Sequence, residues 1–468
     1  MTNETDQRSR RFGEDRTAWI ISYTPVCKEP RVIRQAMALR DSGWRVVVFG
    51  LNGPVACPDW WHHVSLPESL VREQPTVRPV PQAHIPQIVI VRKIQTLVRL
   101  VLRKIQTLLR LTSRAPALIE ERMSILVRRA GQVLASAKVP SLLRQYGARI
   151  HGRFVEGFEC KRIVIRNYAK KATHRHPDQK PSLVLCHDYF TADIGWQVAR
   201  SFRARMVIDC HEYAPGQYMQ DPLWVRWHRP RVIALQQYFL SRADAVTTVC
   251  EGIAGLLNAE NKLKRPVRVV RSVPFFVEQP FRPAGNPLTV MYHGEIYASR
   301  GLHFAVRSLP LWRPEFRLVL RGYSDPSYVE ELQHLANELG VADRFSIEPP
   351  VAFHEIVPAA NRADIGYFVH QDISPQRRFA LPNKFFEYIM AGLALCISDL
   401  PEMARLVRQY DLGALVTGCD EKAIADAINS FDRENIDAYK KRSIEAARQL
   451  NWEAESRHML SLYEELFR

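Results

Sequence analysis

The hydrophobic positions of this chain fall into two blocks in which short apolar runs alternate with helical patterns. In the first block, "AWIISYTP" (18–25) and "RVVVFGL" (45–51) flank a stretch with helical spacing, and the pattern resumes at "PSLVLCHDYF" (181–190) and "ARMVIDCHE" (204–212). The second block begins at "PLTVMYHGEI" (287–296) and continues to "LALCISD" (393–399). Apolar runs of this length between helices are typical of parallel strands buried on both faces. We therefore predict an α/β protein with two Rossmann-like, doubly wound domains.

The same pattern sets the expected domain limits. A polar tail (1–17) precedes a first domain (18–275), and a proline-rich linker leads to a second domain (286–445). A last helix (446–468) either extends the second domain or returns to the first. Segment 85–178 lacks the strand pattern and is predicted to be a basic helical insertion in the first domain. Ligands of such sheets bind at the carboxyl ends of the strands, so we expect the chemistry in a cleft between the two domains.

The insertion contains the phrase RKIQTL twice, at 92–97 and 103–108. A repeat of eleven residues spans three helical turns, so equivalent residues return to the same face. This places a basic stripe opposite an apolar face, with two lysines on the border: Arg92, Arg99, Arg103, Arg110, Lys93 and Lys104. The pattern is that of a basic amphipathic helix, which lies on an anionic membrane or packs against the first domain or another subunit.

Charge and composition limit the classes of molecule that this chain is expected to bind. The chain of 468 residues has a net charge of +16, and residues 91–175 contain 20 basic and 4 acidic residues, so the remainder is neutral overall. A confined positive charge favours one polyanionic partner, either a phospholipid surface or nucleic acid. Aromatic residues that would stack on bases are absent from 91–114, which disfavours single-stranded nucleic acid. We therefore expect an anionic membrane surface and no nucleic acid.

The chain carries no signal for export or for crossing a membrane. Its polar start lacks the apolar core of a signal peptide, and no uncharged apolar run approaches the roughly 20 residues that span a bilayer. The eight cysteines are scattered without CxxC spacing, which indicates reduced thiols rather than a metal site. We expect a cytoplasmic protein peripheral to the inner face of the cell membrane.

Polar residues capable of chemistry gather after four of the predicted strands or at the following helix. The clusters are "CHDYF" with His187 and Asp188, "DCHEY" with Asp209, His211 and Glu212, "HGEIYASRG" with Glu295, Arg300 and Gly301, and "LPNKFFEYIMAG" with Leu381, Asn383, Lys384 and Glu387. Structural roles compete with functional ones, since histidines can fill a core, aspartates can cap helices, and neighbouring opposite charges can form a solvated salt bridge. Arg31 in "KEPRVIRQ" is either an acceptor-side residue or surface charge.

The last cluster has the clearest chemical meaning. Lys384 lies at a helix amino terminus, where free backbone N–H groups and the helix dipole attract phosphate. Glu387 follows two phenylalanines, and a carboxylate is costly to bury there unless a ligand needs it. A carboxylate can accept both hydrogen bonds of a ribose diol.

"DAVTTVCEGI" (244–253), "HGEIYASRG" and above all "PNKFFEYIMAGLALCISDLPEM" (382–403) resemble glycosyltransferase family 4. This resemblance implies retaining enzymes of the GT-B fold that use nucleotide sugars, with an amino-terminal acceptor domain and a carboxyl-terminal donor domain. It implies that Glu387 holds the donor ribose, that Arg300 with Gly301 contacts the diphosphate, and that Lys384 assists. It places His187 beside the reacting sugar and backbone donors near 379–381.

Two positions depart from the family pattern. Phe379 stands where a second glutamate is common, and Glu295 stands where an arginine often follows the glycine of the diphosphate loop. They imply either a different donor environment or lost activity. The expected function is a metal-independent, retaining transfer of a sugar to a membrane lipid-linked glycan, in bacterial surface polysaccharide biosynthesis. The alternatives are a catalytically impaired, membrane-bound assembly partner and a nucleic-acid binder that uses the basic helices. The donor base, the sugar and the linkage are left open.

Overall fold

The computed structural model describes residues 16–26, 29–51, 62–66 and 180–468. The chain divides into two compact units, residues 1–66 with 171–468 and residues 67–170. All the described residues belong to the first unit. The whole predicted 85–178 insertion lies outside the described residues, including the repeated basic helix with Arg92, Lys93, Arg99, Arg103, Lys104 and Arg110.

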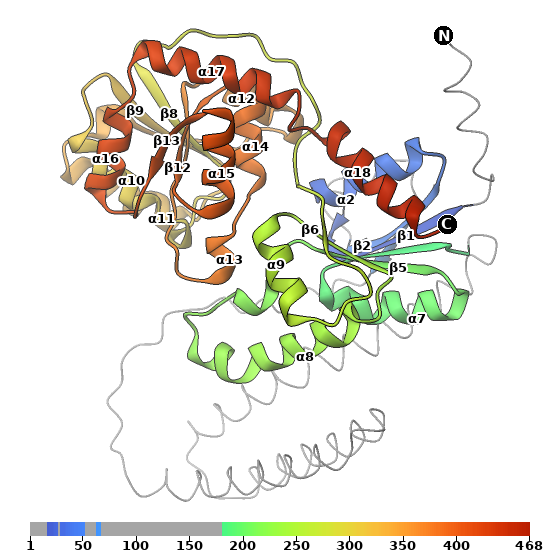
Figure 1. Ribbon diagram of the computed structural model, residues 1–468. Coiled ribbons are helices and arrows are strands. Elements are labelled where there is room, and N and C mark those ends of the chain that lie inside the picture. Colours follow the sequence, from blue (N-terminus) through green and yellow to red (C-terminus); the bar gives the residue numbers. More distant parts are fainter. Residues whose placement is uncertain (1–15, 27–28, 52–61, 67–179) are drawn as a thin grey trace, which may run out of the picture. The chain divides into compact units, whose positions relative to one another are not determined.

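The first sheet has seven parallel strands in the order β3-β2-β1-β4-β5-β6-β7 (Figure 1). Its strands are β1 (Thr17–Pro25), β2 (Arg45–Leu51), β3 (His62–Leu66), β4 (Leu183–His187), β5 (Arg205–Cys210), β6 (Ala245–Thr248) and β7 (Arg268–Val269). The connecting helices include α2 (Pro30–Asp41), α7 (Ala192–Phe202), α8 (Arg229–Leu240) and α9 (Glu251–Glu260). All five residues of β4 are buried, as the prediction of a sheet covered on both faces requires.

The second sheet has six parallel strands in the order β10-β9-β8-β11-β12-β13. They are β8 (Leu288–His293), β9 (Phe316–Arg321), β10 (Phe345–Glu348), β11 (Ile365–Phe368), β12 (Ala394–Ser398) and β13 (Gly413–Val416). The helices are α10 (Leu302–Ser308), α11 (Pro326–Glu338), α12 (Ile356–Ala360), α13 (Pro375–Arg378), α14 (Asn383–Met390), α15 (Pro401–Tyr410), α16 (Glu421–Asn429) and α17 (Arg433–Ala447). The prediction of two doubly wound, Rossmann-like domains is confirmed.

The last helix, α18 (Trp452–Glu465), packs against α2 of the first sheet (Figure 1). Asn451 caps it by accepting a hydrogen bond from the backbone N–H of Ala454 at 2.9 Å. The indole Nε1 of Trp452, which is 2% exposed, donates to the carbonyl of Arg34 at 3.1 Å. The chain therefore passes from the first sheet to the second and back.

Two elements of the first domain were not predicted. Strand β3 is a short segment rich in histidine and, among the described strands, pairs with β2 alone. In α8, Gln236 is buried whereas Tyr238 is 37% exposed, so the apolar residues do not form one stripe. Among the described helices, none is long and apolar enough to span a bilayer.

Candidate active site

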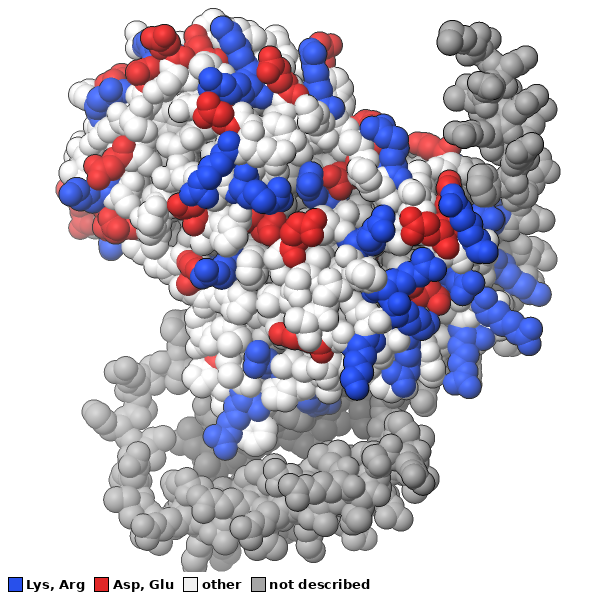
Figure 2. Space-filling model, in the orientation of Figure 1, with Lys and Arg blue, Asp and Glu red and all other residues white. Residues whose placement is uncertain are grey.

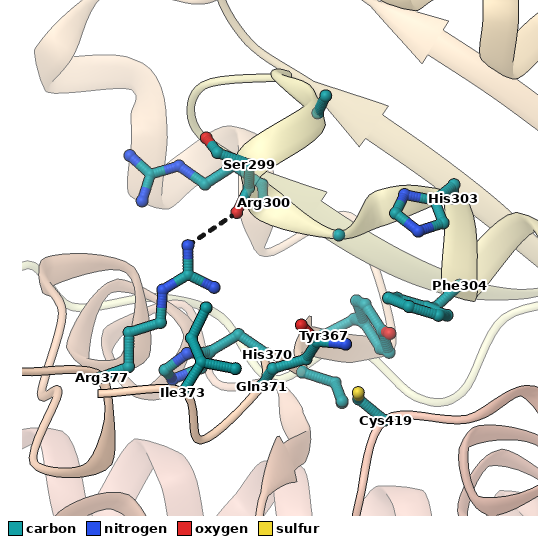
Figure 3. Close-up of a pocket in the computed structure, with 13 residues that line it drawn as sticks. Ser299, Arg300, His303, Phe304, Tyr367, His370, Gln371, Ile373, Arg377 and Cys419 are labelled. Atoms are coloured by element: carbon teal, nitrogen blue, oxygen red, sulfur yellow. Dashed lines mark hydrogen bonds between the residues drawn. The ribbon is translucent and has the colours of Figure 1, made fainter. Parts of the chain in front are cut away.

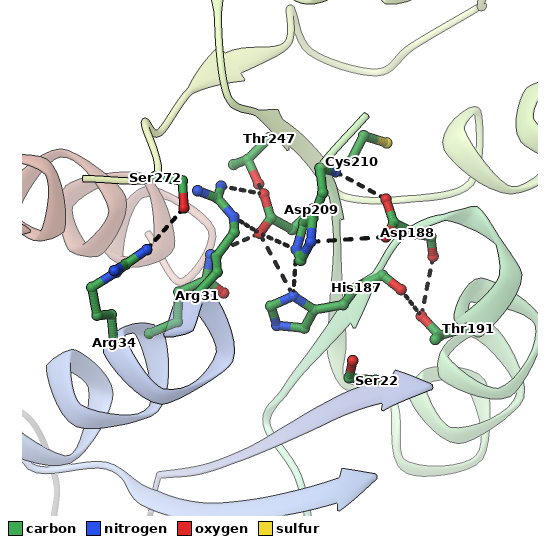
Figure 4. A network of polar contacts seen from close by, with 12 residues as sticks. Ser22, Arg31, Arg34, His187, Asp188, Thr191, Asp209, Cys210, Thr247 and Ser272 are labelled. Carbon is green, nitrogen blue, oxygen red and sulfur yellow. Dashed lines mark hydrogen bonds and ion pairs between the residues drawn. The ribbon is translucent and has the colours of Figure 1, made fainter. Parts of the chain in front are cut away.

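The first cluster of candidate residues forms where β4 and β5 end. These strands are neighbours, and His187 lies opposite Asp209 in their register. Asp209 is fully buried and accepts two hydrogen bonds from Arg31 of α2, from Nε at 2.6 Å and from Nη2 at 2.7 Å. Gln35 and Thr247 donate to the same carboxylate at 2.7 and 2.6 Å. Figure 4 shows Arg31, Thr247 and His187 gathered around Asp209.

Arg31 is therefore buried, with only 2% of its surface exposed. The prediction that it could be surface charge is wrong. Burial opposes ionisation of Asp209, but the charge of Arg31 and its hydrogen bonds hold the pKa of the carboxyl well below the ordinary value. A buried ion pair of this geometry fixes α2 against the end of β5.

Two histidines lie beside this ion pair. His187 Nδ1 and His211 Nε2 are 2.7 Å apart, and His211 Nε2 lies 3.4 Å from an oxygen of Asp209. Burial and the charge of His211 lower the pKa of His187 well below its usual value. Burial also opposes protonation of His211, but the negative charges of Asp188 and Asp209 raise its pKa. The surroundings therefore favour the neutral form of His187 and the protonated form of His211.

The remaining first-domain candidates shape the loops around the histidines. Asp188 has a left-handed backbone, with φ of 63°, and its carboxylate accepts the backbone N–H of His211 at 2.9 Å. Glu212 accepts a hydrogen bond from Gln217. In the described chain, His187, Asp209 and His211 have the spacing of a metal site. The oxygens of Asp209 are already engaged by four donors of the protein, so this cluster does not fit a metal ion well.

On the second sheet, Glu387 of α14 lies against the end of β8. Its Oε2 is 2.7 Å from Nε2 of His293, and the side chain is 14% exposed. The backbone N–H of His293 donates to the hydroxyl of Tyr388 at 3.0 Å, which holds the histidine in place. Burial opposes ionisation, but the hydrogen bond from His293 and the charges of His293 and Lys384 keep the pKa of Glu387 below the ordinary value. The site thus presents a carboxylate that accepts hydrogen bonds.

Lys384 lies one turn before Glu387 on α14. Its ammonium donates to the hydroxyl of Tyr292 at 2.9 Å and lies 4.2 Å from the centre of that ring. Burial, followed by the positive charge of Arg300, lowers the pKa of Lys384 to about 7. Gly294, with φ of 125°, makes room for it, because a Cβ there would lie 2.7 Å from the ammonium nitrogen.

A pocket opens beside these residues, between the start of α10 and the ends of β11 and β13 (Figure 3). Arg300 and Gly301 line one side of it, and His370, Arg377 and Cys419 line the other. Arg377 donates to the carbonyl of Ser299 at 3.0 Å. Burial, with the charges of Arg377, Lys384 and Arg300, lowers the pKa of His370 to about 4. Two arginines that line the pocket, with Lys384 nearby, make it suited to an anion.

Arg300 also pairs with Glu295 by a hydrogen bond, so the salt-bridge alternative from the sequence is present. The two side chains are 43% and 56% exposed, so solvent screens the pair and it is weak. Gly301 has a φ of 70° and precedes α10, which turns the chain from Arg300 into the helix.

The other donor-side candidates lie in the segment before α14. Asn383 is the first residue of the helix, and Leu381 is buried with 6% exposure. The carbonyl of Phe379 accepts a hydrogen bond from the thiol of Cys250 at 3.2 Å. The aromatic ring of Phe379 packs against Gly252, where a Cβ would lie 2.1 Å from it. Phe379 therefore has a packing role in place of a second carboxylate.

Sequence reasoning missed His293, His370 and Arg377. His293 stands in the quoted "HGE" phrase, but its partner Glu387 lies 94 residues away. His370 follows β11 in a loop, and Arg377 lies in the four-residue helix α13, which is too short to give a helical pattern in the sequence. The excess of cations in "QRRF" was the available signal for Arg377.

Comparisons with known proteins agree with this arrangement. Residues 29–272 match the family model described as glycosyl transferase 4-like domain, and residues 287–431 match the model described as glycosyl transferases group 1. A D-inositol 3-phosphate glycosyltransferase of Xylanimonas cellulosilytica is 27% identical over 194 residues. That match covers 39% of this chain and 43% of the relative, less than half the length of either protein.

Solved structures share the fold over nearly the whole chain. Sucrose-phosphate synthase from Thermosynechococcus elongatus has a TM-score of 0.63 with 16% identity, covering 97% of this chain and 99% of that one. Anabaena HepE in complex with UDP and glucose has a TM-score of 0.60 with 11% identity, covering 96% of this chain and 100% of that one. The two Rossmann-like domains are those of a GT-B glycosyltransferase.

Proposed function

Because the chain belongs to the glycosyl transferase 4-like family, with a group 1 domain at 287–431, we propose that it transfers a sugar from a nucleotide sugar to a lipid-linked glycan at a membrane surface. The nucleotide sugar is a co-substrate, and the transfer retains the anomeric configuration. The product would be a bacterial surface polysaccharide. The observation that carries the proposal is the pairing of Glu387 with a cation-lined pocket on the same edge of the second sheet.

The donor would bind with its ribose on Glu387 and its diphosphate among the cations. Glu387 is kept ionised and can exchange its hydrogen bond from His293 for those of a ribose diol. Lys384 lies one helical turn from that carboxylate, and Arg300 and Arg377 line the pocket. These charges match a diphosphate, which accepts hydrogen bonds from several cations at once.

The same cations would also act in the chemical step. When the bond between the anomeric carbon and the diphosphate breaks, negative charge accumulates on the departing oxygens. Lys384 and the two arginines can stabilise this charge without a metal ion. Retention is consistent with attack from the face of the leaving group, where a phosphate oxygen takes the proton of the acceptor hydroxyl.

A thermal-shift screen followed by a transfer assay tests this function. Among nucleoside diphosphates and their sugar conjugates, one ligand at about 100 times its Kd should stabilise the fold by roughly 2.7 kcal/mol. Glu387→Ala should lose this shift and sugar transfer, whereas Glu338→Ala, at an exposed glutamate on α11, should keep both. Full transfer by Glu387→Ala would refute the assignment of the donor site.

Described residues support the membrane part of the proposal independently of the basic repeat. None of the residues of the π-helical turn Trp224–His228 is buried. Around this turn, Tyr218, Leu223 and Trp227 are 64%, 57% and 37% exposed, and Arg226 lies 5.4 Å from the Trp227 ring. Aromatic residues next to arginine are typical of surfaces that insert at the headgroup level of a bilayer.

The wider surface of the first domain carries basic side chains, whose charge is opposite to that of an anionic membrane. Figure 2 shows Lys and Arg side chains gathered at the lower right of this face, where the first sheet lies, whereas both signs mix over the second. Four cations at the starts of β5 and β7 are between 45% and 54% exposed, and they outnumber their two ion-pair partners, Asp244 and Glu465: Arg205, Lys264, Arg265 and Arg268. Each cation in excess of these carboxylates contributes about 1 kcal/mol of attraction to an anionic leaflet.

Cosedimentation with liposomes tests the membrane surface. The double variant Leu223→Ser with Trp227→Ser should bind vesicles containing phosphatidylglycerol at least several-fold more weakly than the wild type. Leu311→Ser is the matched control, because that leucine is 54% exposed on the second domain. Removal of residues 85–150 separates the contribution of the repeat. Unchanged binding by both the double variant and the deletion would contradict membrane attachment.

A catalytically impaired assembly partner is the second candidate, and the pairing of Glu295 with Arg300 favours it. In this case the pair would persist and no nucleotide sugar would bind. Because both side chains are about half exposed, a diphosphate can displace the carboxylate at little cost. The thermal-shift screen separates the two functions, since the impaired partner predicts no shift with any nucleotide.

A further inference from the structure

The contact between His187 and His211 requires one shared proton. The two ring nitrogens, Nδ1 of His187 and Nε2 of His211, are 2.7 Å apart, and the rings meet edge to face at 84°. At this distance one imidazole nitrogen donates and the other accepts. Which ring donates decides where the other ring carries its own proton.

Asp209 determines the donor. Its carboxylate is held ionised by Arg31, and one of its oxygens lies 3.4 Å from the same Nε2 of His211, closer than the 3.8 Å from that oxygen to Nδ1 of His187. A carboxylate can only accept, so a proton on Nε2 of His211 satisfies both Asp209 and His187. The opposite arrangement would aim a lone pair of His211 at a buried negative charge. On the other side of the ring, Nδ1 of His211 lies 3.9 Å from Asp188, which favours a second proton there.

With Nδ1 of His187 accepting, the proton of its neutral ring is on Nε2. This nitrogen is buried and has no hydrogen-bond partner among the described residues. A buried donor without a partner is costly, so a site that keeps one reserves it for a ligand.

We propose that His211 is a positioning residue that fixes His187 in the Nε2–H tautomer. His187 then acts as a hydrogen-bond donor to an oxygen of the bound sugar or its phosphate, and not as a proton acceptor. This ligand rests on the proposed function, whereas the tautomer does not. The ion pair of Arg31 and Asp209 also has a role in this arrangement, because the ionised carboxylate orients the proton of His211.

Two-bond 1H–15N correlation spectra of the full-length protein, labelled with 15N-histidine, test the tautomer without any substrate. The signals of His187 are assigned by their loss in His187→Gln. We expect His187 to show a protonated Nε2 and an unprotonated Nδ1 in the wild type. His211→Gln should keep this tautomer, because its amide N–H can replace Nε2–H, whereas His211→Leu should give a mixture or the Nδ1–H form.

A protonated Nδ1 on His187 in the wild type would overturn the proposal, whether or not any variant folds. An unchanged tautomer in folded His211→Leu would overturn it equally. The side chain of His211 is 19% exposed, so His211→Gln and His211→Leu both change a ring at the edge of the core and not one that is fully buried.

Hydrolysis of the nucleotide sugar that the thermal-shift screen identifies, with release of its nucleoside diphosphate, gives a second readout. We expect His211→Leu to lower kcat by about 10- to 100-fold, towards the loss found when one preorganised donor is removed, with KM changed far less. His211→Gln should recover most of the activity. Equal activity of the two variants would contradict the positioning role. An absence of turnover in the wild type would count against the proposed function alone, because the spectra report on the tautomer in the free protein.

Discussion

Binding of a nucleotide sugar should take up a proton, because Lys384 is poised between its two charge states. Burial and Arg300 lower the pKa of this lysine to about 7, and its ammonium is held by the hydroxyl of Tyr292. A diphosphate placed beside Lys384 would favour the charged form. Its pKa in the complex should therefore return to or exceed the ordinary lysine value of about 10.4.

The size of the effect follows from these two pKa values. At pH 8, about nine tenths of the free protein has a neutral Lys384, so binding should take up about 0.9 proton. The uptake should be about 0.5 at pH 7 and about 0.1 at pH 6. Since the charged form binds the anion, affinity is greatest below pH 7 and falls as the pH rises, approaching about tenfold, or 1.4 kcal/mol, for each further unit.

Isothermal titration calorimetry in phosphate and Tris buffers measures this uptake, because the buffers release protons with different enthalpies. The diphosphate of a nucleotide sugar does not titrate between pH 6 and 8, so the proton comes to the protein. Lys384→Met should bind weakly and with no pH dependence, and Lys422→Met, on the exposed side of α16, should behave as the wild type. An uptake below about 0.2 proton at pH 8 in the wild type would refute the reasoning.

Three further substitutions test the supports of the site. Asp209→Asn leaves the buried arginine of α2 without a counter-charge and should lower the free energy of unfolding by about 3–5 kcal/mol, measured by urea denaturation. Gly294→Ala puts a Cβ at φ of 125° against the ammonium of Lys384, so it should cost about 1–2 kcal/mol and abolish proton uptake. Arg377→Gln should weaken nucleotide-sugar binding by about tenfold, the loss of one charge-assisted hydrogen bond, whereas Arg378→Gln next to it should bind normally in the same calorimetric titration. An unchanged free energy of unfolding for Asp209→Asn would contradict the first role, and proton uptake by Gly294→Ala would contradict the second. Equal affinities of Arg377→Gln and Arg378→Gln would contradict the third.

The sequence predicted what depends on chain order and local pattern. Apolar runs predicted both sheets, and the strand-end positions of His187, Asp209 and His211 agree with the rule that ligands bind at the carboxyl ends of parallel strands. The helix that begins at Asn383 follows from its apolar spacing and the preceding proline. These inferences use neighbours in sequence or in strand order.

The remaining contacts depend on tertiary neighbours that the sequence does not indicate. Arg31 looked like a candidate for surface charge because its partner Asp209 is 178 residues away. His293 has no meaning as a site residue until β8 and α14 are packed together. Phe379, which stands where the family often has a glutamate, is likewise explained only by its tertiary contact, because its ring packs against Gly252 of α9.

The return of α18 to the first domain has a consequence for biosynthesis. The side chains of Trp452 and Tyr463, both at most 2% exposed, complete the burial of a domain whose first strand begins at Thr17. A nascent chain therefore cannot finish its first domain until the whole second domain has left the ribosome, a delay of about 10–40 s at ordinary rates of translation. During that interval the apolar surface beneath α18 stays exposed, so the amino-terminal domain is the natural client of a chaperone while the carboxyl-terminal one folds.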